Sequence, residues 1–87
     1  MNQQPVFSGF HALSEPIRLQ ILELLQDGEL CVSDMCHKLN IAQPKLSFHL
    51  KTLKAADLVT VRKHGRWMYY RLNANQFNLL EGYLANY

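Results

Sequence analysis

The chain carries two cysteines, Cys31 and Cys36, with Ser33 between them. Ser33 followed by Asp34 predicts the cap and first turn of a helix, with Cys31 just before that helix and Cys36 in its first turn. The N-terminal end of a helix stabilises negative charge, and the thiolate is the form of cysteine that binds metals and reacts with oxidants. We therefore weigh three roles, in this order: metalloid binding, a reversible disulfide or polysulfide link, and structural burial.

Basic residues gather in one part of the sequence. Residues 38–71 hold eight lysines and arginines against one acid, Asp57, whereas the remainder holds Arg18 against six acids, and the whole chain has a net charge of only +2. The eight basic residues are Lys38, Lys45, Lys51, Lys54, Arg62, Lys63, Arg66 and Arg71. An ordinary solvated surface would also carry lysines, but this asymmetry favours binding to the phosphate backbone of a nucleic acid.

The elements that position these residues follow from apolar spacing and turn signals. Helices are expected over 5–13, 16–26, 33–40, 43–56 and after Asn73. Segments 58–62 and 67–72 are rich in β-branched and aromatic residues, which predicts a hairpin with a basic turn at 63–66 and a short strand over 29–32. Two short helices with a tight connection, followed by a hairpin, describe a winged helix-turn-helix. We expect one mainly α domain with a small β-hairpin (α+β) over residues 1–87.

The helix expected from residue 43 has inward leucines and outward polar side chains. An amide can read adenine and an aromatic ring can touch a thymine methyl, so Gln43, Ser47, Phe48 and His49 are candidates for base contacts. His49 could equally be a half-buried structural group. Lysines on this helix and the basic hairpin tip would contact phosphates. The full set of DNA-binding candidates is Gln43, Lys45, Ser47, Phe48, His49, Lys51, Lys54, Arg62, Lys63, His64 and Arg66.

Four segments carry a resemblance to a known family: FHALSEPIRLQIL at 10–22, ELCVSDMC at 29–36, QPKLSFHLKTL at 43–53 and GRWMYYRL at 65–72. In that order they resemble the opening segment, the metalloid-binding box of the arsenic-responsive subgroup, the recognition helix and the wing of the ArsR family of bacterial repressors. The resemblance implies a homodimeric winged-helix repressor. Such a repressor binds an inverted-repeat operator in double-stranded DNA and leaves it when an effector binds.

The resemblance also implies a ligand for the two cysteines. The family's arsenic-responsive box places thiols at the positions of Cys31, Ser33 and Cys36, so a serine stands at the middle position here. Arsenite or antimonite, As(III) or Sb(III), would bind two thiolates plus a small thiol, hydroxide or water and act as the inducer. Binding would distort the helix at 33–40 and lower the DNA affinity. No resident cofactor is expected, and the zinc site of another subgroup is not expected because the last helix offers only Glu81.

The first and last helices carry more apolar side chains than a small core needs. A domain of this size buries little of its own surface, so a partner subunit would help it. The resemblance implies that these two helices pair across a two-fold axis, which places two recognition helices about one DNA turn apart. The candidate dimer-interface residues are Val6, Phe10, Phe77, Leu80 and Leu84.

Other classes of function are disfavoured. The sequence has no Gly-rich phosphate loop and no Ser/His/Asp arrangement, so we do not expect an enzyme. No apolar run approaches the ~18 residues that cross a bilayer, and the N-terminus lacks signal-peptide features. We therefore expect no membrane partner and a cytoplasmic location. A winged-helix module that binds RNA or another protein without an effector is the alternative from a different class.

Overall fold

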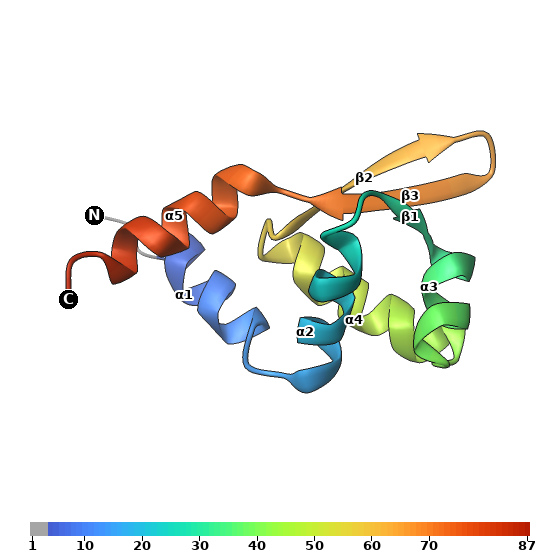
Figure 1. The fold of residues 1–87 in the computed structure, drawn as a ribbon, viewed down its shortest axis with the longest axis horizontal. Coiled ribbons are helices and arrows are strands. Elements are labelled where there is room, and N and C mark those ends of the chain that lie inside the picture. The colour runs from blue at the N-terminus through green and yellow to red at the C-terminus, as the bar shows by residue number, and fades with distance from the viewer. Residues whose placement is uncertain (1–3) are drawn as a thin grey trace.

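The computed structural model describes residues 4–87, so residues 1–3 of the expected domain lie outside the described residues. The elements run in the order α1 (Gln4–Ala12), α2 (Pro16–Leu25), β1 (Leu30–Cys31), α3 (Val32–Leu39), α4 (Gln43–Ala55), β2 (Val59–His64), β3 (Trp67–Leu72) and α5 (Ala74–Leu84) (Figure 1). The expected α+β fold with a small β-hairpin is confirmed. None of the helices in this described part of the chain is long and apolar enough to cross a membrane.

The turn between α1 and α2 shows how local chemistry decides a helix start. Glu15 is the N-cap of α2, and its carboxylate accepts a hydrogen bond from the backbone N–H of Arg18 at 3.0 Å. The hydroxyl of Ser14 instead donates to the carbonyl oxygen of His11 at 2.6 Å, at the end of the preceding helix. Pro16 occupies the first turn of α2, where its missing N–H costs nothing.

The sheet has the strand order β1-β3-β2, with both pairings antiparallel. The β2–β3 hairpin keeps its register from Val59 opposite Leu72 to His64 opposite Trp67, so His64, expected in the turn, lies in a strand. The turn contains Gly65 at φ +61, a left-handed conformation that glycine adopts without steric cost. The hairpin is therefore longer than expected, and it projects beyond the helices (Figure 1).

The core lies where α4 meets the other helices and the sheet. Leu46, Leu50 and Leu53 of α4 are buried, as their helical spacing predicts. Leu80 of α5 is also buried, with 4% of its surface exposed, and a Cβ added at Gly9 of α1 would come within 2.8 Å of its side chain. The expectation that Leu80 faces a partner subunit is therefore corrected, because its side chain fills the space between α5 and α1 of its own chain.

Candidate nucleic-acid interface and thiol site

The helix-turn-helix is formed by α3 and α4. Asn40 ends α3 in a left-handed conformation at φ 53, and its backbone N–H bonds to the carbonyl oxygens of Cys36 and His37. This conformation reverses the chain, so that α4 starts only three residues later, at Gln43. The short connection expected at 40–42 is therefore present, and it sets α4 against α3.

One face of α4 is exposed along its whole length. The predicted contact residues on this face are Gln43, Lys45, Ser47, Phe48, Lys51 and Lys54, and all six are exposed. Phe48 stands out because 64% of its surface is exposed, although it is a large apolar side chain. Amide, hydroxyl, aromatic and ammonium groups on one helix face match the groups that DNA-reading helices present to base edges and phosphates.

His49 does not belong to that face, and its assignment to DNA contact is corrected. Only 7% of its surface is exposed, and its ring Nδ1 lies 3.3 Å from Nη1 of the buried Arg18. Because His49 lies three residues after Leu46 and four before Leu53, its side chain falls on the same buried side of α4 as theirs. The sequence was equally compatible with a structural role for His49, and its small exposed fraction decides in favour of that role.

The hairpin carries the remaining basic candidates. Lys63, His64 and Arg66 are exposed at its tip, and the Arg66 guanidinium lies 5.6 Å from the centre of the Trp67 ring. Arg62 differs, because its Nη2 donates to the Glu29 carboxylate at 2.6 Å. That hydrogen bond holds the pKa of Glu29 below its usual value. Arg62 thus already has a partner within the chain, whereas the tip presents its cations to solvent.

The two cysteines lie at the start of α3. Cys31, and not Ser33, is the N-cap residue, so the helix begins at Val32 and Cys36 lies past its first turn. The helix starts early because Cys31 also ends β1, where it pairs with Tyr69, and the chain turns directly from strand to helix. Cys31 is buried, Cys36 is partly buried, and both are free thiols.

The serine at the middle position lies next to the first thiol. The hydroxyl oxygen of Ser33 is 3.3 Å from the sulfur of Cys31. In residues 4–87, no group of three or more His, Cys, Asp or Glu side chains could hold a metal ion. The place where the sequence predicts As(III) or Sb(III) binding thus holds two free thiols and a hydroxyl beside one of them.

The helices α1 and α5 lie side by side at the end of the molecule opposite the hairpin tip (Figure 1). Among the predicted interface residues, Leu84 is 58% exposed, while the others on these helices are at least partly buried in the chain's own core: Val6, Phe10, Phe77 and Leu80. Phe7 and Tyr87 belong to the surplus of apolar side chains that the sequence shows near the two ends, but the list of interface candidates omits them; they are 71% and 90% exposed. Leu79, which the sequence analysis did not single out, is 44% exposed. Spacing along a helix does not tell which of two apolar faces a residue occupies, so the burial is needed to assign it.

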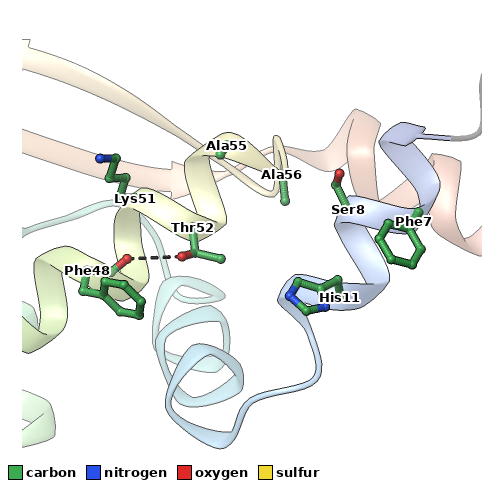
Figure 2. A pocket seen from close by; sticks show the side chains of 8 residues that line it. All are labelled: Phe7, Ser8, His11, Phe48, Lys51, Thr52, Ala55 and Ala56. Carbon is green, nitrogen blue, oxygen red and sulfur yellow. Dashed lines mark hydrogen bonds between the residues drawn. The ribbon is translucent and has the colours of Figure 1, made fainter.

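A pocket of about 440 Å³ separates α1 from α4. Figure 2 shows Phe7, Ser8 and His11 of α1 on one side and Phe48 and Thr52 of α4 on the other. The hydroxyl of Thr52 donates to the backbone carbonyl of Phe48 within α4, at 3.3 Å. No acidic side chain lines this pocket.

Comparison with known proteins agrees with this geometry. Residues 15–61 match the family described as bacterial regulatory protein, arsR family. The chain is 49% identical over 61 residues to an arsenical resistance operon repressor of Staphylococcus xylosus and 46% identical over 65 residues to one of Escherichia coli K12. These matches cover 70% and 74% of this chain but only 59% and 56% of the two relatives.

The fold has solved counterparts. The solution structure of a homodimeric winged helix-turn-helix DNA-binding domain from Mycobacterium bovis is similar, with a TM-score of 0.80 and 30% sequence identity. The similarity covers 93% of this chain and 76% of that one. The order of helices and strands in this chain matches the expected winged helix-turn-helix, and a solved protein of similar sequence has the same fold.

Proposed function

Because the chain belongs to the arsR family of bacterial regulatory proteins, we propose that it represses transcription by binding double-stranded DNA as a homodimer. The observation that carries this proposal is the exposed face of α4, where polar, aromatic and basic side chains lie together beside a projecting basic hairpin. The arsenical resistance operon repressors at 49% and 46% identity support the same activity. No arrangement of side chains in the described residues suggests catalysis.

The contacts divide into two kinds. Gln43 and Ser47, in the first half of α4, would read base edges, because the first turns of a recognition helix lie deepest in the major groove. Lys51 and Lys54 would hold phosphates, and Lys63 and Arg66 would do so from the hairpin tip. Phosphate contacts contribute affinity and depend on salt, whereas base contacts contribute the choice of site.

Dimerisation is proposed through α1 and α5. Their exposed apolar residues, above all Leu84 and Phe7, cover part of the end of the molecule opposite the hairpin. The similar domain from Mycobacterium bovis is described as homodimeric. A two-fold axis at this end would present two copies of α4 to one duplex, so the operator would be an inverted repeat.

The test is selection of a binding site from random duplexes, followed by affinity measurements on the selected site and on single-base variants. Gln43→Ala and Ser47→Ala should flatten the preference between these sites, by about 1–3 kcal/mol at the base that each residue reads. Gln20→Ala, an exposed glutamine on α2, is the matched control and should keep the preference. An unchanged preference in both α4 variants would show that these residues do not read bases, and selection of no duplex would refute DNA binding.

We further propose that As(III) or Sb(III) acts as inducer at Cys31 and Cys36. Two As–O bonds of arsenous acid break and two As–S bonds form, each thiol proton leaves with a hydroxide as water, and the third hydroxide stays on arsenic. Cys31 caps α3 while Cys36 lies within it, so drawing both sulfurs onto one arsenic distorts the start of the helix. Because α3 packs against α4, that distortion would favour a form with low DNA affinity.

The inducer is tested by DNA release with arsenite and antimonite in wild type, Cys31→Ser and Cys36→Ser. Wild type should release its operator, and both variants should stay bound. Ser33→Cys, which adds the third thiol beside Cys31, should lower the arsenite concentration needed for release. Release by a thiol oxidant or polysulfide, but not by arsenite, would favour the redox alternative. A wild type that ignores all of these reagents would show that the cysteines are not the sensor.

A further inference from the structure

Two buried polar bridges join α4 to α1, one near each end of α1. The first runs through Arg18 of α2, whose Nε donates to the carbonyl oxygen of Ala12 at 2.6 Å and whose Nη1 donates to Nδ1 of His49 at 3.3 Å. The second is Gln76 of α5, whose Nε2 donates to the carbonyl oxygens of Pro5 and Ala56, both at 3.0 Å. Ala12 ends α1 and Pro5 lies in its first turn, so the two bridges hold opposite ends of one helix.

In the Arg18 bridge, the charged donor group of the arginine meets two acceptor atoms. An arginine only donates hydrogen bonds, so Nδ1 of His49 accepts and the ring proton lies on Nε2. The guanidinium lies against the last carbonyl of α1, the end of a helix that favours a cation. The Glu15 carboxylate lies 3.7 Å from the same Nδ1, too far for a hydrogen bond, and it accepts from the backbone N–H of Arg18 instead. Arg18 is only 8% exposed, so losing its partner on α4 would leave a buried donor without an acceptor.

The Gln76 bridge satisfies backbone groups of two helices at once. Ala56 is the C-cap residue of α4, where helix carbonyls lack partners within the helix, and Pro5 belongs to α1. Gln76 is 6% exposed, and its bond to Ala56 is buried while its bond to Pro5 is partly buried. A Cβ at Gly9 would lie 3.2 Å from Nε2 of Gln76, which shows how closely α1 approaches this amide.

Between the bridges, α1 and α4 are separated by the pocket described above. The side chains of Phe7 and His11 face those of Phe48 and Thr52 across open space of about 440 Å³ (Figure 2). Tightly packed side chains would fix the angle between two helices through their shape. Here that filling is missing on one side, so the angle depends strongly on the two bridges.

We propose that these bridges fix the tilt of α4 on α1 and thereby set the half-site spacing that the dimer accepts on DNA. The inference rests on the proposed function, in which α1 belongs to the dimer interface and α4 reads the half-site. A 13-residue helix is about 20 Å long, so a tilt of about 10° displaces its far end by about 3.4 Å. That is about the length of one base pair, and the two-fold axis applies the displacement to both half-sites. Arg18, His49 and Gln76 are thus positioning residues that touch no DNA.

The experiment measures affinity for the inverted repeat that wild type selects, with its central spacer shortened or lengthened by one and two base pairs. Wild type should lose about tenfold or more in affinity for each added or removed base pair, because one such step shifts and rotates one half-site against the other. His49→Leu should bind the repeat with the best spacer more weakly than wild type does. Its affinity for repeats with neighbouring spacer lengths should then be only about threefold lower than for its own best spacer. Gln76→Leu should broaden the profile in the same way. His49→Gln, whose amide oxygen can accept from Arg18, should keep the narrow profile.

Controls separate this role from a general loss of stability. Thr52→Val removes a hydrogen bond that stays within α4, and it should keep the shape of the spacer profile. Should His49→Leu fail to fold, the double variant Arg18→Met/His49→Leu replaces the polar pair with apolar side chains of similar size. A profile with the wild-type shape in the folded bridge variants refutes the inference, whereas a wild type that selects no inverted repeat refutes the proposed function instead.

Discussion

Leu80 and Leu84 lie one turn apart on α5, and their burial assigns them different tasks. Leu80 is 4% exposed and packs beside Gly9 of α1, whereas Leu84 is 58% exposed. We predict that Leu80→Ala weakens the fold of each subunit, while Leu84→Glu separates the subunits and leaves each one folded. The pair thus tests the boundary between the intrachain core and the dimer surface.

The magnitude for Leu80 follows from its burial. Truncating a buried leucine to alanine costs about 2–5 kcal/mol, since apolar contacts are lost and a cavity remains. A domain of this size is stable by roughly 4–13 kcal/mol, so the variant loses a large fraction of its free energy of unfolding. A loss of about 3 kcal/mol corresponds to a fall in Tm of about 12–24 °C. Leu84→Glu changes an exposed position, so it should alter the free energy of unfolding of a single subunit by no more than about 0.5 kcal/mol.

The assay combines urea unfolding at several protein concentrations with sedimentation. The unfolding midpoint of a wild-type dimer should rise with protein concentration, because association stabilises the folded form by mass action. The midpoint of Leu84→Glu should not depend on concentration, and this variant should sediment as a monomer. The reasoning is refuted if Leu80→Ala keeps the wild-type midpoint but dissociates, or if Leu84→Glu stays dimeric.

Three further substitutions test other parts of the structure. Arg66→Ala should weaken binding to all duplexes alike and reduce the slope of log affinity against log salt by about one, as measured by salt titration; a loss confined to one site would contradict phosphate contact. Burial raises the pKa of Tyr70, so the folded state holds this proton longer than the unfolded one, and stability should fall as pH rises above about 10; Tyr70→Phe should flatten that fall in alkaline urea titrations. Gly9→Ala should lower the free energy of unfolding, measured in urea, by about 1–3 kcal/mol through crowding against Leu80, and a gain in stability would show that α5 gives way.

The face of α4 was predictable because it depends on local periodicity. Leucines spaced by three and four residues define the buried side of a helix wherever it packs, so the outward positions of Gln43 and Ser47 follow from sequence alone. Position 49 shares that spacing, three residues after Leu46 and four before Leu53, but a polar histidine there can be buried or can extend to solvent. What the sequence did not show is its polar partner Arg18, which is distant in the chain but lies 3.3 Å from the His49 ring in the fold.

The thiol site shows a similar limit at a helix boundary. The sequence identified Cys31, Ser33 and Cys36 as one group, and the 3.3 Å approach of the Ser33 hydroxyl to the Cys31 sulfur is compatible with that grouping. It placed the N-cap at Ser33, two residues after the observed Cys31, because serine is the better cap by residue type. The pairing of Cys31 with Tyr69 in the sheet overrides that preference, and such pairing joins residues far apart in the chain.

By itself, the sequence determined the succession of helices and strands, the basic character of 38–71 and the polar face of α4, since all three arise from neighbouring residues and their spacing. The tertiary structure alone decided which apolar residues of α1 and α5 serve their own core, which cation the hairpin holds in an ion pair with Glu29, and how two buried bridges hold α4 on α1. These depend on contacts between segments whose relative placement is set by the packing of the whole core, so no local pattern records them.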